Sequence, residues 1–192
     1  MFPDNRVRTG FSLVWLRLVL FLVLLGILAG LGLWWKSARA APDEFVYLHG
    51  PLTSPDFSSA QIVFRLSSPH GQRAFSLAEL EALPAVQYRA TQPQLKRSFV
   101  YTGVPLRDLA RLAGLSGQNL RVMADDEFGA TIRASDYGPF PVMLAYLADG
   151  HLITSAQKGP LEVVFPNAQY PARFQTYGSQ WVWFATSLGA AP

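Results

Sequence analysis

The sequence predicts an α+β fold for residues 41–192, a mainly β domain with two or three short helices, preceded by an N-terminal hydrophobic helix. Three observations predict it. Short runs rich in β-branched and aromatic residues recur from residue 45 to residue 187. Helix-start signals stand at only two places between them, and no internal repeat or linker divides residues 41–192. A length of 192 residues suits one such domain with a modest extension.

The N-terminal segment, residues 1–40, is predicted to be a signal peptide or a membrane anchor. The run Leu18–Trp35 is 18 apolar residues long, enough to cross a bilayer of about 30 Å as a helix. Arg6 and Arg8 precede it, and Ala38–Ala40 forms a signal-peptidase signature. The run is longer than a usual signal peptide, so cleavage and retention in the inner membrane both stay open. In either case, we expect residues 41–192 to be periplasmic.

The elements of the following domain are read from residue patterns in chain order. A capping box, Ser76 to Glu79, opens a helix that ends before Pro84. Pro105 suits the first position of a second helix, and Gly114 its end. Ala148–Gly150 predicts a tight hairpin. The predicted strands are Phe45–His49, Gln61–Leu66, Val86–Thr91, Leu95–Tyr101, Leu120–Ala124, Ala130–Ala134, Val142–Leu147, Leu161–Phe165 and Gln180–Ser187.

Charge and composition exclude several classes of function. The formal net charge of the chain is +3, but residues 1–40 alone carry five basic side chains and one acidic one. Residues 41–192 hold 11 basic and 12 acidic side chains, which excludes the electrostatic footprint of a nucleic-acid-binding domain. The absence of cysteine excludes disulfides, thiolate metal sites and a cysteine nucleophile. His49, His70 and His151 stand apart from one another, so no metal site is predicted.

Three segments carry residue types suited to binding a flat polar ligand. Asp125–Gly129 places three carboxylates at the end of a strand, either as a solvated turn or as acceptors for an N–H edge. Lys158–Leu161 is either a strand-entry turn or a place where Gly159 allows the backbone to approach a ligand. Tyr177–Phe184 is read as a strand whose Trp181 and Trp183 share one face, which is either core packing or a stacking platform.

From Phe75 to Leu188 these pieces, taken together, resemble the oxidoreductase molybdopterin-binding domain, the sulfite-oxidase fold, in its small stand-alone bacterial form. The order and spacing of the pieces carry the resemblance, because no single one is specific. The matching pieces are Phe75–Leu77, Leu80–Pro84, Tyr101–Leu109, Ala124–Phe128, Asp149–Gly150, Lys158–Leu161, Phe165–Pro166 and Trp181–Trp183.

The missing cysteine separates this chain from the catalytic members of that fold, which hold molybdenum through a thiolate. The resemblance also implies that a molybdenum enzyme is exported already folded by the twin-arginine route, whereas this leader has no Arg-Arg pair. Molybdenum and redox catalysis are therefore disfavoured. The resemblance instead implies a periplasmic pterin-binding protein, not an enzyme, that informs a membrane-bound signalling partner.

The cofactor-binding residues that follow from the resemblance lie in the three segments named above and at one arginine. Glu127 or Asp126 would pair with the donor edge of a pterin or molybdopterin-like ligand, and Trp181 or Trp183 would stack on its ring. Glu162 is expected outside the pocket. The complete predicted set is Asp126, Glu127, Phe128, Lys158, Gly159, Pro160, Arg173, Trp181 and Trp183, with no catalytic residue and no metal ligand.

Two alternatives of other classes remain. One is a molybdenum-cofactor oxidoreductase with an unusual metal ligand. The other is a scaffold or interaction module whose cofactor pocket has decayed.

Overall fold

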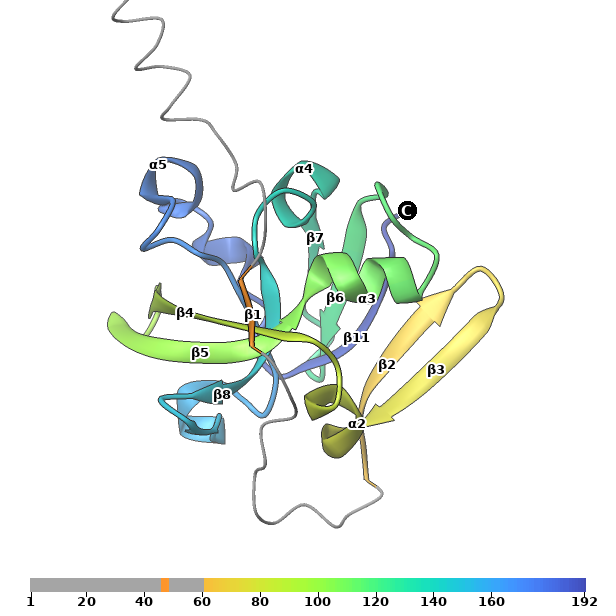
Figure 1. Ribbon diagram of the computed structural model, residues 1–192, viewed down its shortest axis with the longest axis horizontal. Coiled ribbons are helices and arrows are strands. Elements are labelled where there is room, and N and C mark those ends of the chain that lie inside the picture. The colour runs from red at the N-terminus through yellow and green to blue at the C-terminus, as the bar shows by residue number, and fades with distance from the viewer. Residues whose placement is uncertain (1–45, 49–60) are drawn as a thin grey trace, which may run out of the picture. The chain divides into compact units, whose positions relative to one another are not determined.

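The computed structural model describes residues 46–48 and 61–192, which form a mainly β domain of two sheets (Figure 1). The predicted N-terminal helix and the ends of the first predicted strand lie outside these residues. Within the described ranges, no helix has the length and apolar character needed to traverse a bilayer.

The first sheet has the strand order β1-β4-β5-β8-β10, with β9 paired to β8, and all its pairs are antiparallel. Its pairing runs from Val86↔Gly103 between β4 and β5 to Glu162↔Ala145 between β10 and β8. The strands are β1 (Tyr47–Leu48), β4 (Ala85–Gln92), β5 (Arg97–Pro105), β8 (Met143–Ala148), β9 (His151–Leu152) and β10 (Glu162–Val164).

The second sheet has the order β3-β2-β11-β6-β7, and one of its pairs is parallel, between β11 and β2. The other pairs are antiparallel hairpins or the β11–β6 pair. The strands are β2 (Ile62–Ser68), β3 (Gly71–Ser76), β6 (Leu120–Ala124), β7 (Gly129–Ile132) and β11 (Ala185–Ala190).

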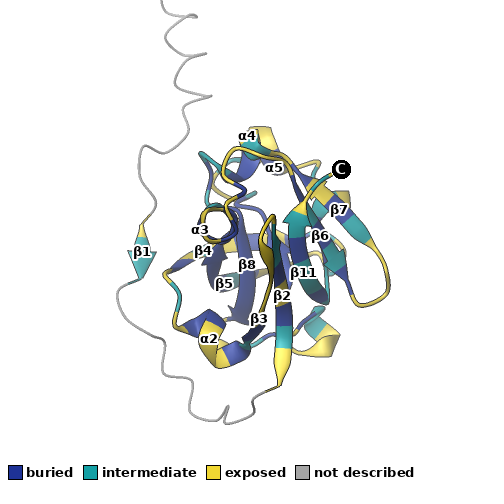
Figure 2. Ribbon diagram, turned by 90° about the vertical axis from the view of Figure 1, so that its right-hand side faces the viewer, coloured by how far each residue is buried: buried dark blue, intermediate teal, exposed yellow. Residues whose placement is uncertain are grey.

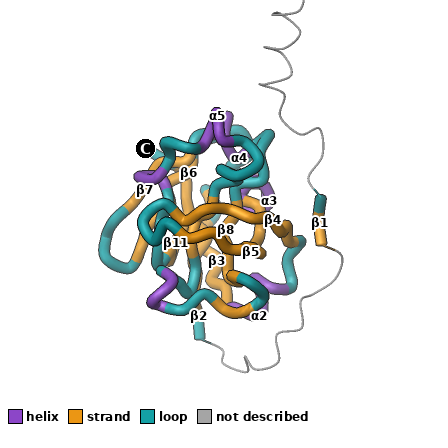
Figure 3. The backbone as a smooth tube through the Cα atoms, turned by 90° about the vertical axis from the view of Figure 1, so that its left-hand side faces the viewer, coloured by secondary structure: helices purple, strands orange, loops and turns teal. Residues whose placement is uncertain are grey.

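The described residues include four short α-helices, where the sequence predicted two or three: α2 (Leu77–Glu81), α3 (Leu106–Leu112), α4 (Ala134–Tyr137) and α5 (Pro171–Phe174). Both halves of the predicted capping box at Ser76 are formed. Pro105 ends β5 and caps α3, so the helix begins one residue later than predicted. Helices α4 and α5 lie at the same end of the domain in Figures 1 and 3.

The hydrophobic core draws side chains from both sheets and from α2 and α3. Figure 2 shows β8 dark blue along its length, because all six of its residues are buried. The largest buried side chains are Trp181, Tyr101, Tyr137, Tyr146, Phe64, Phe75, Phe165 and Phe174. At about 25 cal/mol per Å² of apolar surface removed from water, such aromatic residues dominate the stability of a domain this size.

Two strand predictions need correction. The sequence predicted one strand over residues 180–187, but Gly178–Gln180 forms a short 3₁₀ helix, η2, residues 181–184 are irregular, and β11 starts at Ala185. The backbone φ of Phe184 is 50°, in the left-handed region, and this value is incompatible with a continuous strand. The second correction is strand β3, which the sequence analysis missed because most of its residues are exposed and polar.

Candidate functional site

A cavity of about 300 Å³ lies between three segments that are distant in sequence. One is the turn that follows β4, the second is the turn between β6 and β7, and the third is η2 with the residues after it. Its wall is mainly apolar and aromatic. It is lined by Gln94, Asp126, Phe128, Gly178, Ser179, Trp181, Trp183 and Phe184. The structure thus brings two of the three predicted segments together, the acidic turn and the tryptophan pair.

Within the acidic turn, Asp126 is the carboxylate that lines the cavity. Its Oδ1 accepts a hydrogen bond from the backbone N–H of Phe128 at 3.0 Å, which fixes the turn. Glu127 occupies the left-handed region, with φ of 67°, and is exposed outside the cavity lining. The N–H of Asp125 donates to the carbonyl of Phe184 at 3.1 Å and so ties the acidic turn to the tryptophan segment.

The tryptophan segment, residues 181–184, is held by single backbone hydrogen bonds to neighbouring segments instead of by regular strand pairing. The N–H of Phe184 donates to the carbonyl of Lys158 at 3.2 Å, and the N–H of Val163 donates to the carbonyl of Val182 at 2.9 Å. Trp181 is 2% exposed and packs edge-on against Tyr101, with ring centroids 6.2 Å apart. Trp183 is half-buried, so it is the more accessible of the two indoles.

The Lys158–Pro160 turn contacts one of the residues that line the cavity, Trp183. The Lys158 ammonium lies 4.6 Å from the centroid of the Trp183 ring, a cation–π contact. None of Lys158, Gly159 and Pro160 lines the cavity directly. A side chain at Gly159 would collide with the backbone carbonyl and the side chain of Ile153, so the close approach that requires glycine here is internal packing.

Arg173 lies outside the cavity lining. Its guanidinium binds the carboxylate of Asp136, with Nε 3.0 Å and Nη2 2.5 Å from Oδ1. The Asp136 side chain is 2% exposed, so the pair is partly desolvated. The hydroxyl of Tyr177 donates to the same oxygen at 3.4 Å. The sequence placed Arg173 near the ligand, whereas the structure uses it to neutralise a buried acid.

Glu162 lies outside the cavity lining, where the sequence analysis expected it. It is fully buried on β10, a point on which the sequence analysis made no prediction. Burial raises the pKa of its carboxyl to about 8, against the opposing effects of Gln92, Tyr101 and Lys158. An acidic residue inside the apolar run Leu161–Phe165 was the available signal, because a charge in a buried strand requires a reason.

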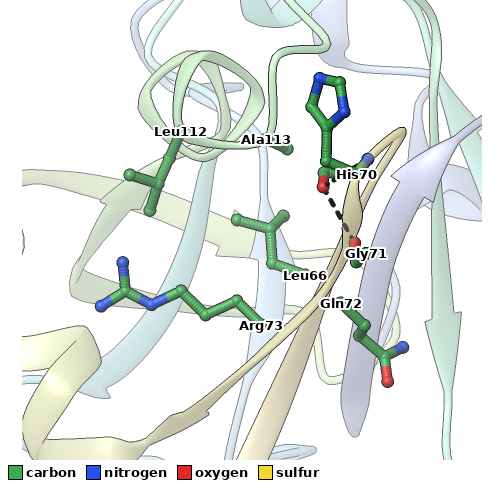
Figure 4. A pocket seen from close by; sticks show the side chains of 8 residues that line it. Leu66, His70, Gly71, Gln72, Arg73, Leu112 and Ala113 are labelled. Atoms are coloured by element: carbon green, nitrogen blue, oxygen red, sulfur yellow. Dashed lines mark hydrogen bonds between the residues drawn. The ribbon is translucent and has the colours of Figure 1, made fainter.

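A second hollow, of about 250 Å³, lies between the β2–β3 hairpin and α3 (Figure 4). Its lining includes the apolar side chains of Leu66 and Leu112 and the polar side chains of Arg73 and His70. None of the residues predicted for ligand binding lies there. It also lacks the aromatic walls of the first cavity, which we therefore take as the candidate binding site.

The donor set does not fit a protein-held molybdenum ion. The sequence has no cysteine, so no thiolate ligand exists. Across residues 46–48 and 61–192, no group of three or more histidine and carboxylate side chains is arranged to hold a metal. The aromatic cavity, in contrast, has a size and a lining suited to a small flat heterocycle.

Comparison with known proteins places this architecture in a class. No family model matches the sequence, and no curated protein sequence matches it. Among solved structures, the chain has the fold of the molybdopterin oxidoreductases, which confirms the resemblance predicted from the sequence. One similar structure is the sulfane dehydrogenase SoxCD from Paracoccus pantotrophus, with a TM-score of 0.53 and 19% sequence identity. The match covers 66% of this chain and 37% of the SoxCD chain, so this chain spans well under half of that protein's length.

Proposed function

We propose that this protein binds a pterin-type heterocycle in the cavity between the acidic turn and the tryptophan segment, without catalysing a reaction. The observation that carries the proposal is the meeting of Asp126, Phe128, Trp181 and Trp183 around one cavity. The segments that provide them are more than 50 residues apart in the sequence, so their meeting is a product of the fold.

The chemistry of a pterin matches this lining. A pterin has a flat bicyclic ring, which stacks on aromatic side chains, and a 2-amino/N3–H edge, which pairs with a carboxylate. Asp126 supplies that carboxylate at the rim. The Lys158 ammonium already lies over the Trp183 ring, so the ligand ring would stack on the opposite face of this indole.

The wider role that we propose is that of a periplasmic ligand sensor for a membrane-bound signalling partner. Its support is the sequence alone: the apolar run Leu18–Trp35 behind Arg6 and Arg8, and the resemblance stated above. A reporter that is active only outside the cytoplasm, fused after Pro192, tests the compartment. Activity of a cytoplasm-only reporter at the same position would contradict it.

The binding test is a fluorescence titration of the full chain with pterin, 2-amino-4-oxopteridine. We expect Trp183→Ala and Asp126→Asn each to weaken binding by about tenfold to a hundredfold, through lost stacking and a lost charge-assisted hydrogen bond. Trp183 is chosen over Trp181 because the buried Trp181 also belongs to the core. The matched control is Asp125→Asn, an exposed carboxylate of the same turn outside the cavity lining.

Two outcomes would count against the proposal. Equal binding by the parent, Asp126→Asn and Trp183→Ala would show that pterin binds elsewhere. Absence of pterin binding by the parent would favour a scaffold module with the same fold.

A further inference from the structure

Strand β3 is the outer strand of the second sheet, and β2 is its neighbour on one side (Figure 1). The two-residue turn of the β2–β3 hairpin makes Ser68↔Gly71 a hydrogen-bonded pair, and the two kinds of pair alternate from there along the ladder. The N–H and C=O groups of Gln72 and Ala74 therefore point away from β2. In the part of the chain that the structure describes, these four groups have no hydrogen-bond partner, so β3 can accept a further strand.

The hairpin is held in shape before any partner binds. The Ser68 hydroxyl accepts a hydrogen bond from the backbone N–H of His70 at 3.2 Å and donates one to the carbonyl of Gly71 at 2.9 Å. These two bonds close the turn at the start of β3. A strand that is already ordered pays little conformational entropy when another segment pairs with it.

The hollow between the hairpin and α3 lies on the face of β3 that carries Arg73 (Figure 4). Leu66 and Arg73 are paired across the two strands, so their side chains share this face. Leu112, at the end of α3, also lines the hollow and is 46% exposed. A strand paired with β3 would direct every second side chain to this face, where an apolar one can cover Leu112.

The hairpin carries positive charge and no carboxylate. Residues 61–76 include Arg65 and Arg73 and no aspartate or glutamate. The guanidinium of Arg73 lies 4.6 Å from the centroid of the Phe75 ring and, among the described residues, makes no hydrogen bond. Glu79 feels the charge of Arg73, but its carboxylate is bound within the capping box of α2. The donors of Arg73 therefore suit an acidic partner.

We propose that the open edge of β3 and the hollow beside it form a docking site for an extended, acidic segment of a partner protein. The segment pairs with β3 as an added strand, places a carboxylate on Arg73 and lays an apolar side chain against Leu112. A second copy of this chain is the poorer occupant, because pairing two β3 edges would bring the arginines of both hairpins together. The inference goes beyond pterin binding and does not depend on it, since the hollow shares no lining residue with the cavity.

The first arm of the test measures the charge preference. A fluorescently labelled short peptide of alternating glutamate and valine, blocked at both ends, is titrated with the full chain, and its anisotropy is followed. The parent should bind it, and Arg73→Glu should bind it at least about tenfold more weakly. Arg73→Glu should instead gain affinity for the matching lysine–valine peptide. The control is Arg89→Glu, the same charge change at an exposed residue of β4 in the other sheet, which should behave as the parent does.

The second arm measures the strand pairing. The glutamate–valine peptide should slow amide hydrogen exchange in residues 71–76 of the parent, because the outward N–H groups of Gln72 and Ala74 gain acceptors. Ala74→Pro removes one of these donors and no bond of the β2–β3 ladder, so it should abolish binding of the peptide. The exchange measurement needs no substitution and decides the point even where Ala74→Pro does not fold.

Each remaining outcome is decisive. Absence of binding by the parent, equal binding by the parent and Arg73→Glu, or bound peptide without protection of residues 71–76 would overturn the inference. Protection of these residues that grows with protein concentration in the absence of peptide would assign the edge to a second copy and overturn it as well. The affinity for pterin should be the same in the parent and Arg73→Glu. A parent that binds the peptide and no pterin would contradict the proposed function alone.

Discussion

Replacing Glu162 by glutamine should make the protein more stable at neutral pH and remove most of the pH dependence of its stability. The ordinary pKa of a glutamate is 4.5, whereas burial raises that of Glu162 to about 8. The native state therefore holds this proton more tightly than the unfolded chain does. The stabilisation from proton binding is complete below about pH 4.5 and is lost progressively as the pH rises to about 8.

The magnitude follows from the size of the shift. A difference of about 3.5 pH units, at about 1.36 kcal/mol per unit, corresponds to a loss of about 5 kcal/mol across the whole window. At pH 7 the loss is about 3 kcal/mol, which Glu162→Gln should recover because its side-chain oxygen still accepts from Gln92. The two proteins should be nearly equal in stability at about pH 4.5.

Urea denaturation of the full chain at about pH 4.5, 6, 7 and 8 measures this directly. The parent should lose stability steadily along the series relative to Glu162→Gln. Parallel stability curves for the two proteins would refute the reasoning, because they would show that the Glu162 carboxyl has the same pKa in the folded and unfolded chains.

Two further predictions separate packing from ligand binding. Arg173→Met should lower the free energy of unfolding by about 2–3 kcal/mol, because it leaves the buried Asp136 carboxylate without its cation, yet it should leave the affinity for pterin unchanged. Gly159→Ala should cost about 2–4 kcal/mol through collision with Ile153, measured by urea denaturation. Gly117→Ala, where the added carbon meets open space and only the backbone is strained, should cost about 1 kcal/mol.

Opposite results in these two cases are equally informative. A large loss of pterin affinity in Arg173→Met would return this arginine to the binding site, as the sequence analysis placed it. Equal costs for Gly159→Ala and Gly117→Ala would show that the Lys158–Pro160 turn yields to the added methyl group.

Elements that depend on neighbouring residues were predictable from the sequence. The capping box at Ser76 satisfies the first backbone N–H groups of α2 from within four residues. The Asp149–Gly150 hairpin needs only two residues that tolerate positive φ, and both have it, at 52° and 79°. Helices α4 and α5 span four residues each, which is too short for an apolar repeat to appear.

Elements that depend on distant partners were not predictable in this way. The unbroken run of large apolar residues from Trp181 to Phe184 is typical of a buried strand, but hydrogen bonds to the Lys158 carbonyl and to Val163 hold this segment in an irregular path. The prediction that the acidic turn and Trp183 line one site followed from the family resemblance and not from the periodicity of the sequence. The burial of Glu162 is decided by residues distant in sequence, such as Gln92 of β4 and the paired strand β8, about which its own neighbours in the sequence say little.

The place of β11 has a consequence for the order in which the domain can assemble. This strand lies between β2 and β6, and its pairing Ser187↔Arg65 joins residues roughly 120 positions apart. Until β11 arrives, the β2–β3 hairpin has no neighbour within its sheet and the β6–β7 hairpin has none either. Contacts of such long sequence separation form late, after a large loop-closure cost. The incomplete sheet therefore has two unpaired strand edges, those of β2 and β6. The chain is most exposed to aggregation and to proteolysis before β11 pairs with these two strands.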